Sequence, residues 1–178
     1  MMPNPITVNG NWIESVVDSI PNHAVDIKTN LIDVMENHGL EKVDAHGCAY
    51  AAALAASNGG LAFEIEMNSP LFMHEAEREA TKAAAALMGM NNTWFPFVEV
   101  CKIELNNPQD TFTYSHNMHG VSTKKFLMYS LAASIVGKCN GSIKTQYDAL
   151  LAEGLTVEQL RSIGKIAAIV NSIGKIAI

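Results

Sequence analysis

The amino-acid sequence predicts an all-α fold, and three observations support this prediction. Apolar residues recur at three- and four-residue spacing along most of the chain, as on one face of a helix. Alanine-rich stretches without runs of β-branched residues favour helix over strand. Helix-capping patterns recur, and no segment has the alternation expected of a strand. A chain of 178 residues fits one domain, residues 1–178, that can bury a substantial core.

The N-terminal third is expected to hold three helices after a loose arm at residues 1–11, which contains two prolines. The first helix begins at Trp12 and is stopped by Pro21. The second ends at His38-Gly39, because glycine readily takes the backbone conformation that closes a helix. The third covers about 42–57 and is broken by a pair of glycines that follow Asn58.

The middle of the chain carries the clearest predicted helix start, Asn68-Ser69-Pro70. Asparagine and serine cap helix N-termini, and proline fits the first helical position. A loop that contains Pro96 and Pro108 is expected after Met90-Asn91-Asn92, where the two asparagines turn the chain. The chain is predicted to become helical again from about Ser122 to Gly137.

Two further helices are predicted at the C-terminal end. One runs from Cys139 to Ala152 and ends at Gly154. The capping box Thr156-Val157-Glu158-Gln159 opens the last helix. Apolar side chains form a stripe along that helix that is expected to pack against another helix: Leu160, Ile163, Ala167, Val170, Ile173 and Ala177.

Composition and charge limit the classes of function. Hydrophobic residues make up 48% of the chain and charged residues 17%, which predicts that apolar surface is covered by another subunit in a homo-oligomer. The net charge is −6 and no Lys/Arg cluster is present, so nucleic acid is not an expected partner. No signal peptide and no apolar run of membrane-spanning length is read, so no membrane association is expected.

The metal- and redox-active residue types do not form a metal site or a disulfide framework in the sequence. Cys48, Cys101 and Cys139 are odd in number and widely spaced, which predicts reduced thiols in the cytoplasm. Cys48 and Cys101 lie among apolar residues and are expected to be buried. His116 and His119 have a chelating spacing but no third ligand close by, so they are interpreted as ordinary loop histidines. No metal and no cofactor is expected.

Three ordered segments together resemble a known protein family. They are Pro21 to Leu31, Ala86 to Asn92 followed by Trp94 and Phe95, and Gly120 to Phe126 with Cys139 and Gly154-Leu155-Thr156 downstream. The chain resembles the alkyl-hydroperoxidase D (AhpD-like) family of the carboxymuconolactone-decarboxylase-like superfamily. The resemblance implies an all-helical subunit that assembles into trimers or hexamers. It also implies thiol-dependent reduction of hydroperoxides, with electrons from a lipoyl-bearing partner or another thiol reductant.

The family's site is C-x-[HS]-C-x-x-x-H at a helix start, with a glutamate twelve residues before the first cysteine. At the corresponding positions this chain has Cys139, Gly141, Ser142, Gln146 and Leu127, so only Cys139 keeps its chemistry. A serine hydroxyl is not ionised near neutral pH without a strong base, and glutamine cannot carry a proton through a cycle. Without a thiol at position 142, Cys139 cannot form the local disulfide that a lipoyl partner would reduce.

Two functions follow from these substitutions; the four changed site positions favour the first, and the second stays open as the alternative. The first is a non-peroxidatic pseudoenzyme or binding module. The second is an antioxidant thiol peroxidase that works through Cys139 alone, with an external or distant resolving thiol. The predicted helix start and the neighbouring Lys138 favour a reactive thiolate at Cys139, but no base is evident. A third reaction, on small organic acids, uses a histidine and a glutamate elsewhere in the superfamily, and the family pattern places neither residue in this sequence.

Overall fold

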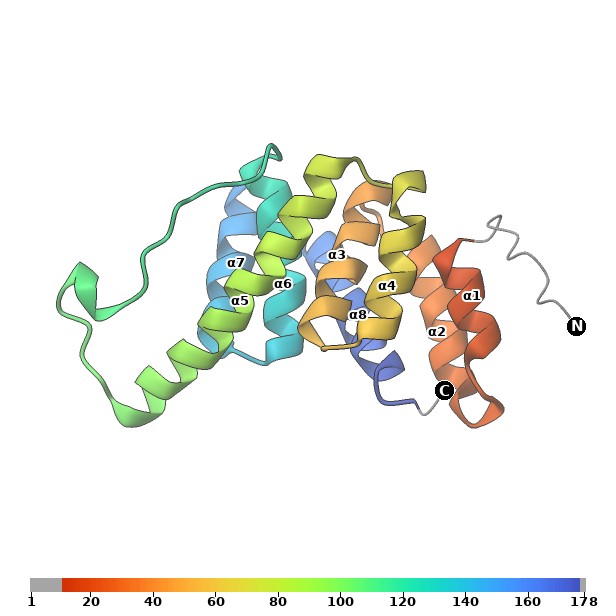
Figure 1. Cartoon of the computed structure of the whole chain (residues 1–178), viewed down its shortest axis with the longest axis horizontal. Coiled ribbons are helices and arrows are strands. Elements are labelled where there is room, and N and C mark those ends of the chain that lie inside the picture. The colour runs from red at the N-terminus through yellow and green to blue at the C-terminus, as the bar shows by residue number, and fades with distance from the viewer. Residues whose placement is uncertain (1–10, 177–178) are drawn as a thin grey trace, which may run out of the picture.

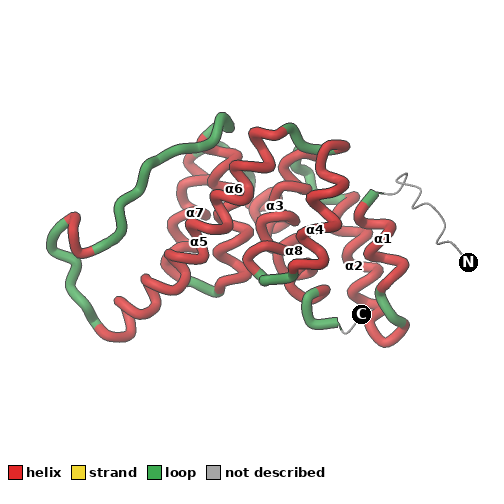
Figure 2. Tube along the Cα trace, in the orientation of Figure 1, coloured by secondary structure: helices red, strands yellow, loops and turns green. Residues whose placement is uncertain are grey.

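The computed structural model of the chain describes residues 11–176, which form eight α-helices and no strand. This confirms the predicted all-α fold (Figures 1 and 2). Residues 1–10 of the expected N-terminal arm lie outside the described part. The helices are α1 (Trp12–Ser19), α2 (Val25–Glu36), α3 (Lys42–Ala55), α4 (Gly59–Asn68), α5 (Glu75–Cys101), α6 (Thr123–Gly137), α7 (Asn140–Ala152) and α8 (Val157–Ile173).

Helix α3 is the centre of the core. It packs against α4, α5, α6 and α8, and every residue from Asp44 to Ala53 is buried. Its alanines and Gly47 have little or no side chain, which lets the neighbouring helices approach closely. At Gly47 the aromatic ring of Tyr129 on α6 fills the space where a side chain would stand, since an added Cβ would lie 2.2 Å from its Cε1.

Most predicted helix ends are confirmed. The side chain of Asn11 caps α1 by accepting a hydrogen bond from the Ile13 N–H, and Gly39 after α2 has a positive φ of +64°. The predicted capping box opens α8: the Thr156 hydroxyl accepts from the Gln159 N–H at 3.2 Å, and the Gln159 side chain accepts from the Thr156 N–H at 3.0 Å. Helix α8 ends at Ile173, and Ala177 lies outside the described residues.

The predicted helix start at Asn68-Ser69-Pro70 is wrong. Asn68 is the last residue of α4, and Ser69–Leu71 form a short 3-10 turn. Both polar side chains bond backward to the helix that they follow: the Asn68 amide donates to the Glu64 carbonyl at 2.8 Å and the Ser69 hydroxyl donates to the Glu66 carbonyl at 2.6 Å. They close one helix instead of capping the next, which starts at Glu75.

The predicted loop after Met90-Asn91-Asn92 is also wrong in its first part. Helix α5 continues through both asparagines and Pro96 to Cys101, and the loop begins at Lys102, in the left-handed region. The asparagine side chains are engaged in tertiary contacts: Asn91 accepts from the Tyr114 hydroxyl at 2.9 Å, and Asn92 donates to the Ala133 carbonyl at 3.3 Å. The C-terminal half of α5 therefore projects beyond the other helices, and the loop 102–122 returns from its far end (Figures 1 and 2).

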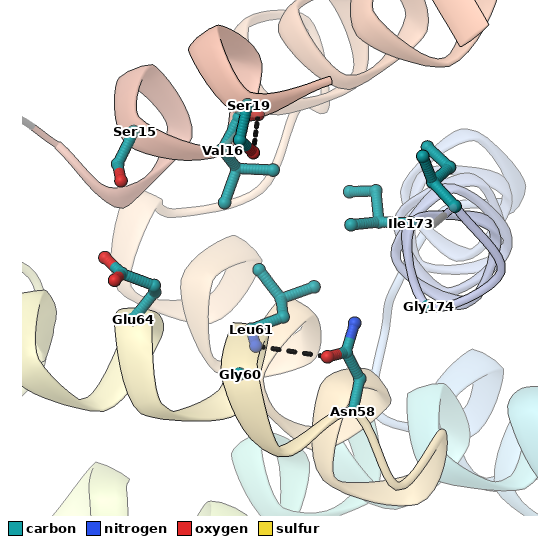
Figure 3. A pocket seen from close by; sticks show the side chains of 10 residues that line it. Ser15, Val16, Ser19, Asn58, Gly60, Leu61, Glu64, Ile173 and Gly174 are labelled. Atoms are coloured by element: carbon teal, nitrogen blue, oxygen red, sulfur yellow. Dashed lines mark hydrogen bonds between the residues drawn. The ribbon is translucent and has the colours of Figure 1, made fainter. Parts of the chain in front are cut away.

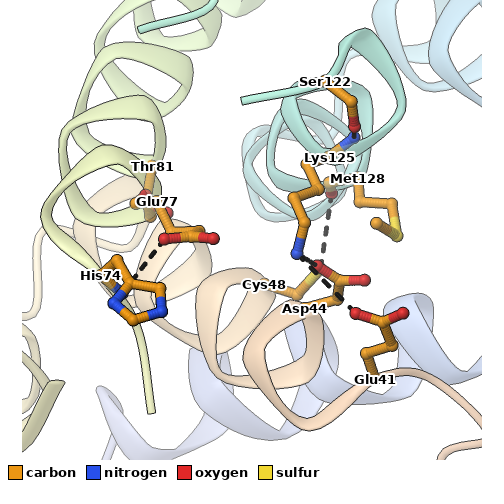
Figure 4. Close-up of polar contacts among 9 residues, drawn as sticks. All are labelled: Glu41, Asp44, Cys48, His74, Glu77, Thr81, Ser122, Lys125 and Met128. Carbon is orange, nitrogen blue, oxygen red and sulfur yellow. Dashed lines mark hydrogen bonds and ion pairs between the residues drawn. The ribbon is translucent and has the colours of Figure 1, made fainter. Parts of the chain in front are cut away.

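Helices α3 and α6 are also joined by buried polar groups (Figure 4). The Lys125 ammonium lies 2.7 Å from the Asp44 carboxylate, and the two side chains are 22% and 10% exposed. Burial raises the pKa of Asp44, and the hydrogen bond and charge of Lys125 oppose that shift. The neighbouring Cys48 thiol donates to the Met128 carbonyl at 3.6 Å. The ion pair thus fixes the position of α6, which leads directly into α7.

Candidate functional site

The candidate site is built on the first two turns of α7. Cys139 is the N-cap residue of this helix, but its side chain makes no capping hydrogen bond and is 1% exposed. Ser142 lies in the first turn and Gln146 follows it by four residues, so both side chains lie on one helix face. Both are buried, whereas Gly141 between them and Cys139 is exposed.

Ser142 and Gln146 line a cavity of about 720 Å³ between α7, α5 and the loop 102–122. This volume lies in the range of small-molecule sites. Helix α5 contributes mainly apolar side chains, and the loop contributes Tyr114 and His116. The remaining lining residues are Leu87, Asn91, Phe95, Val98, Glu99, Gly141 and Thr145.

Two hydrogen bonds engage polar side chains of this cavity. The Tyr114 hydroxyl donates to the Asn91 side chain, which ties the loop to α5. The Gln146 amide donates to the thioether sulfur of Met88 at 3.2 Å, a weak acceptor. Among the described residues Ser142 has no hydrogen bond to His116 or to any other base. Ser142 therefore lacks the partner that an activated serine nucleophile requires.

No thiol lines the cavity. Cys139 is buried at the start of α7, Cys48 is buried in α3, and all three cysteines are free. Burial raises the pKa of the Cys48 thiol well above its usual range, and the nearby Asp44 carboxylate adds to this shift (Figure 4). A thiol held neutral in this way is a poor nucleophile. The predicted burial of Cys48 is confirmed. The predicted burial of Cys101 is wrong: Cys101 is exposed, because it is the last residue of α5, where this helix projects beyond the bundle.

The residue at the family's glutamate position does not line the cavity. Leu127 lies on α6 and packs, partly buried, against the hydrophobic core. Ser142, Gln146 and Gly141 thus line one cavity. Cys139 is buried beside it, and Leu127 packs against the hydrophobic core.

His116, interpreted from the sequence as an ordinary loop histidine, is among the lining residues that the sequence did not predict. It belongs to a loop, has a positive φ of +52°, and lies on the same cavity as Glu99 from α5. No local pattern marks it, because its place depends on how the loop 102–122 folds back onto α5. Within residues 11–176 no group of three His, Cys, Asp or Glu side chains could hold a metal ion.

A second cavity, of about 390 Å³, lies between α1, α4 and the end of α8 (Figure 3). Two of its polar side chains serve the local helices. The Ser19 hydroxyl donates to the Val16 carbonyl at 2.7 Å, and Asn58 accepts from the Leu61 N–H at 3.2 Å as the N-cap of α4. These bonds stabilise helix ends, and we assign no ligand to this cavity.

The comparisons with known proteins agree with this fold. No protein-family model matches the chain. Proteins named "Alkyl hydroperoxide reductase AhpD" match nearly all of it. The protein from Coxiella burnetii is 28% identical over 93% of this chain and 97% of its own length. Those from Methylocella silvestris and Maricaulis maris are 28% and 29% identical, over 90% and 92% of this chain and 91% and 96% of their own lengths. Of the described helices, none is long and apolar enough to cross a bilayer. The chain, whose described residues 11–176 are mostly helical, is thus similar almost end to end to proteins named AhpD.

Proposed function

We propose that this AhpD-like chain is a non-peroxidatic protein that binds a small molecule in the cavity between α5, α7 and the loop 102–122. One observation supports this proposal above the others. Ser142 and Gln146, which stand where the family has its second cysteine and its last histidine, line the cavity, while the Cys139 thiol is covered.

The chemistry of these side chains favours binding over peroxide reduction. A peroxidase cycle needs a thiolate that meets the peroxide and a second thiol that resolves the sulfenic acid. Ser142 offers a hydroxyl without a base, and Gln146 offers an amide that cannot exchange a proton. Both side chains are good hydrogen-bonding groups for a neutral ligand.

The walls of the cavity define the class of ligand. Leu87, Phe95 and Val98 supply an apolar surface, and Ser142 and Gln146 supply hydrogen-bonding groups. A molecule with an apolar body and a neutral polar end satisfies both parts.

We further propose that the chain forms a homo-oligomer, a trimer or a hexamer, in the cytoplasm. Large apolar side chains are exposed on the projecting end of α5 and on the following loop, with Val100 80% and Phe97 50% exposed. Ile103, Leu105 and Phe112 are exposed in the same region. Such a concentration of exposed apolar surface is typical of a covered interface. Light scattering tests this proposal, and a monomer at micromolar concentration would contradict it.

The binding proposal is tested with Nile red, a neutral, largely apolar dye, by fluorescence titration. Thr145→Trp places a large ring into the cavity and is expected to weaken dye binding by about tenfold or more. Lys144→Trp is the matched control, because Lys144 is the neighbouring exposed residue of α7 and does not line the cavity. Equal dye affinity in the two variants would contradict the proposed site.

The peroxidase alternative is tested by steady-state turnover of an alkyl hydroperoxide with dihydrolipoamide as reductant. We expect no turnover above background. Turnover that disappears in Cys139→Ser would instead establish an antioxidant thiol peroxidase that works through Cys139 with an external or distant resolving thiol. That result would overturn the non-peroxidatic proposal.

A further inference from the structure

A third cavity, of about 350 Å³, lies between α1, α2 and the start of α3 and shares no lining residue with the cavity at α7. It is lined by one buried histidine, His46, and by charged and apolar side chains from three helices. His46 is 3% exposed. A buried polar side chain on a cavity wall needs hydrogen-bond partners for its polar atoms.

The orientation of the His46 ring is fixed by two aromatic residues. The Trp12 indole N–H donates to Nδ1 of His46 at 2.8 Å, so the neutral ring carries its proton on Nε2. The ring also stacks on Phe72, with 3.9 Å between ring centroids and 5° between the planes. Among residues 11–176 the Nε2–H has no acceptor. The Nε2–H of His46 is therefore a hydrogen-bond donor without a protein partner, and the contacts of the ring with Trp12 and Phe72 fix its direction.

His46 remains neutral near physiological pH. Burial, together with the charges of Lys42 and His38, lowers its pKa to about 4. The donor is thus an uncharged N–H of fixed direction.

Charged groups of both signs line the same cavity. Lys42 lies one turn before His46 on α3, Glu14 belongs to α1 and Glu36 to α2. In the described part of the chain none of these three groups has an oppositely charged partner within 4.0 Å; the Lys42 ammonium instead lies 4.8 Å from the centroid of the Phe72 ring. The cavity therefore offers positive and negative charge together with a neutral donor.

We propose that this cavity binds a free α-amino acid with an aliphatic side chain. The carboxylate of the ligand accepts hydrogen bonds from His46 Nε2–H and the Lys42 ammonium. The ammonium group of the ligand pairs with Glu14 or Glu36. The apolar side chain packs against Ile13, Val17, Ile32 and Met35, which complete the lining with Asn11. The cavity of Figure 3 lacks this combination, since no basic side chain lines it.

The experiment is isothermal titration of the full chain with L-leucine, isoamylamine and isocaproate, which share one branched side chain. Isoamylamine lacks the carboxylate and isocaproate lacks the ammonium group. We expect L-leucine to bind, and each analogue to bind about tenfold more weakly or worse, since each loses a charge-assisted contact. Absence of L-leucine binding at millimolar concentration, or equal binding of an analogue, would overturn the proposal.

Two variants outside the hydrophobic core locate the site. Lys42→Met is expected to reduce L-leucine affinity about tenfold or more, because it removes the charge that faces the carboxylate. Glu64→Gln is the control, because Glu64 lines the separate cavity of Figure 3, and it is expected to leave the affinity unchanged. His46→Phe tests the donor directly. An unchanged affinity in Lys42→Met would overturn the assignment whether or not His46→Phe folds.

Discussion

The ion pair between Lys125 and Asp44 makes a quantitative prediction about stability. Lys125→Met removes the cation and leaves the Asp44 carboxylate, 10% exposed, without its partner at 2.7 Å. Breaking a buried pair in this way destabilises proteins by about 3–5 kcal/mol, and the 22% exposure of Lys125 favours the lower end. A loss of about 3 kcal/mol corresponds to a fall in Tm of about 6–12 °C for a chain of this size. Thermal unfolding, monitored by circular dichroism, measures this fall in Tm.

The matched control is Lys144→Met, the same substitution in a second ion pair. Lys144 pairs with Asp148 one turn later on α7, but their side chains are 73% and 53% exposed. Exposed pairs of this kind contribute about 0.5 kcal/mol or less. The two variants therefore differ mainly in the burial of the carboxylate that remains. If Lys125→Met lowers Tm no more than Lys144→Met does, the reasoning from burial is refuted.

The pH dependence gives the same prediction an independent test. The folded-state pKa of Asp44 is raised above its unfolded value, so its contribution to stability is present at low pH and is lost as the pH rises through the folded pKa. Lys125 lowers that pKa, so Lys125→Met raises it further. Below this pKa the Asp44 carboxyl group is protonated and uncharged, so it needs no cation beside it. The deficit in Tm of Lys125→Met is therefore expected to be smaller at about pH 4 than at about pH 7, and a larger deficit in acid would contradict this.

Two further predictions concern glycine and the site of α7. Gly47→Ala forces a Cβ to 2.2 Å from the buried Tyr129 ring and is expected to destabilise the fold by about 1–3 kcal/mol. Gly141→Ala has nothing within 4 Å of the added Cβ and is expected to be neutral or slightly stabilising. Equal Tm values for the two variants would contradict the packing of Tyr129 on Gly47. Restoring the family residues together is expected to create hydroperoxide turnover with a dithiol reductant, and a folded but inactive quadruple variant would mean that the site is wrongly aligned. The four substitutions are Leu127→Glu, Gly141→His, Ser142→Cys and Gln146→His.

The sequence predicted helix ends best where local chemistry determines them. The capping box at Thr156, the end of α7 before Gly154 and the start of α6 after Ser122 depend on contacts within a few residues, and the structure has all three. The same signals failed where a side chain had two possible partners. Ser69 could cap a following helix or bond back to the preceding one, and in the structure it bonds back to the Glu66 carbonyl.

Long-range contacts explain the remaining errors. Helix α5 runs on through Pro96, and the asparagines before it bond to Tyr114 and Ala133, which are distant in sequence. The projection of α5 that results exposes Cys101 and lets His116 reach the cavity beside α7. The sequence predicted Ser142 and Gln146 as site residues, but it could not predict the cavity that they line.

The order in which the chain leaves the ribosome has a consequence for α3. Its buried residues face α4, α5, α6 and α8, and α8 is the last helix within residues 11–176. The Gln159 amide at the start of α8 donates to the Gly39 carbonyl at 3.1 Å, which joins residues 120 positions apart. Until α8 emerges from the ribosome, the side of α3 that packs against α8 has no cover. Within residues 11–176, docking of α8 therefore completes the burial of a helix that is made much earlier.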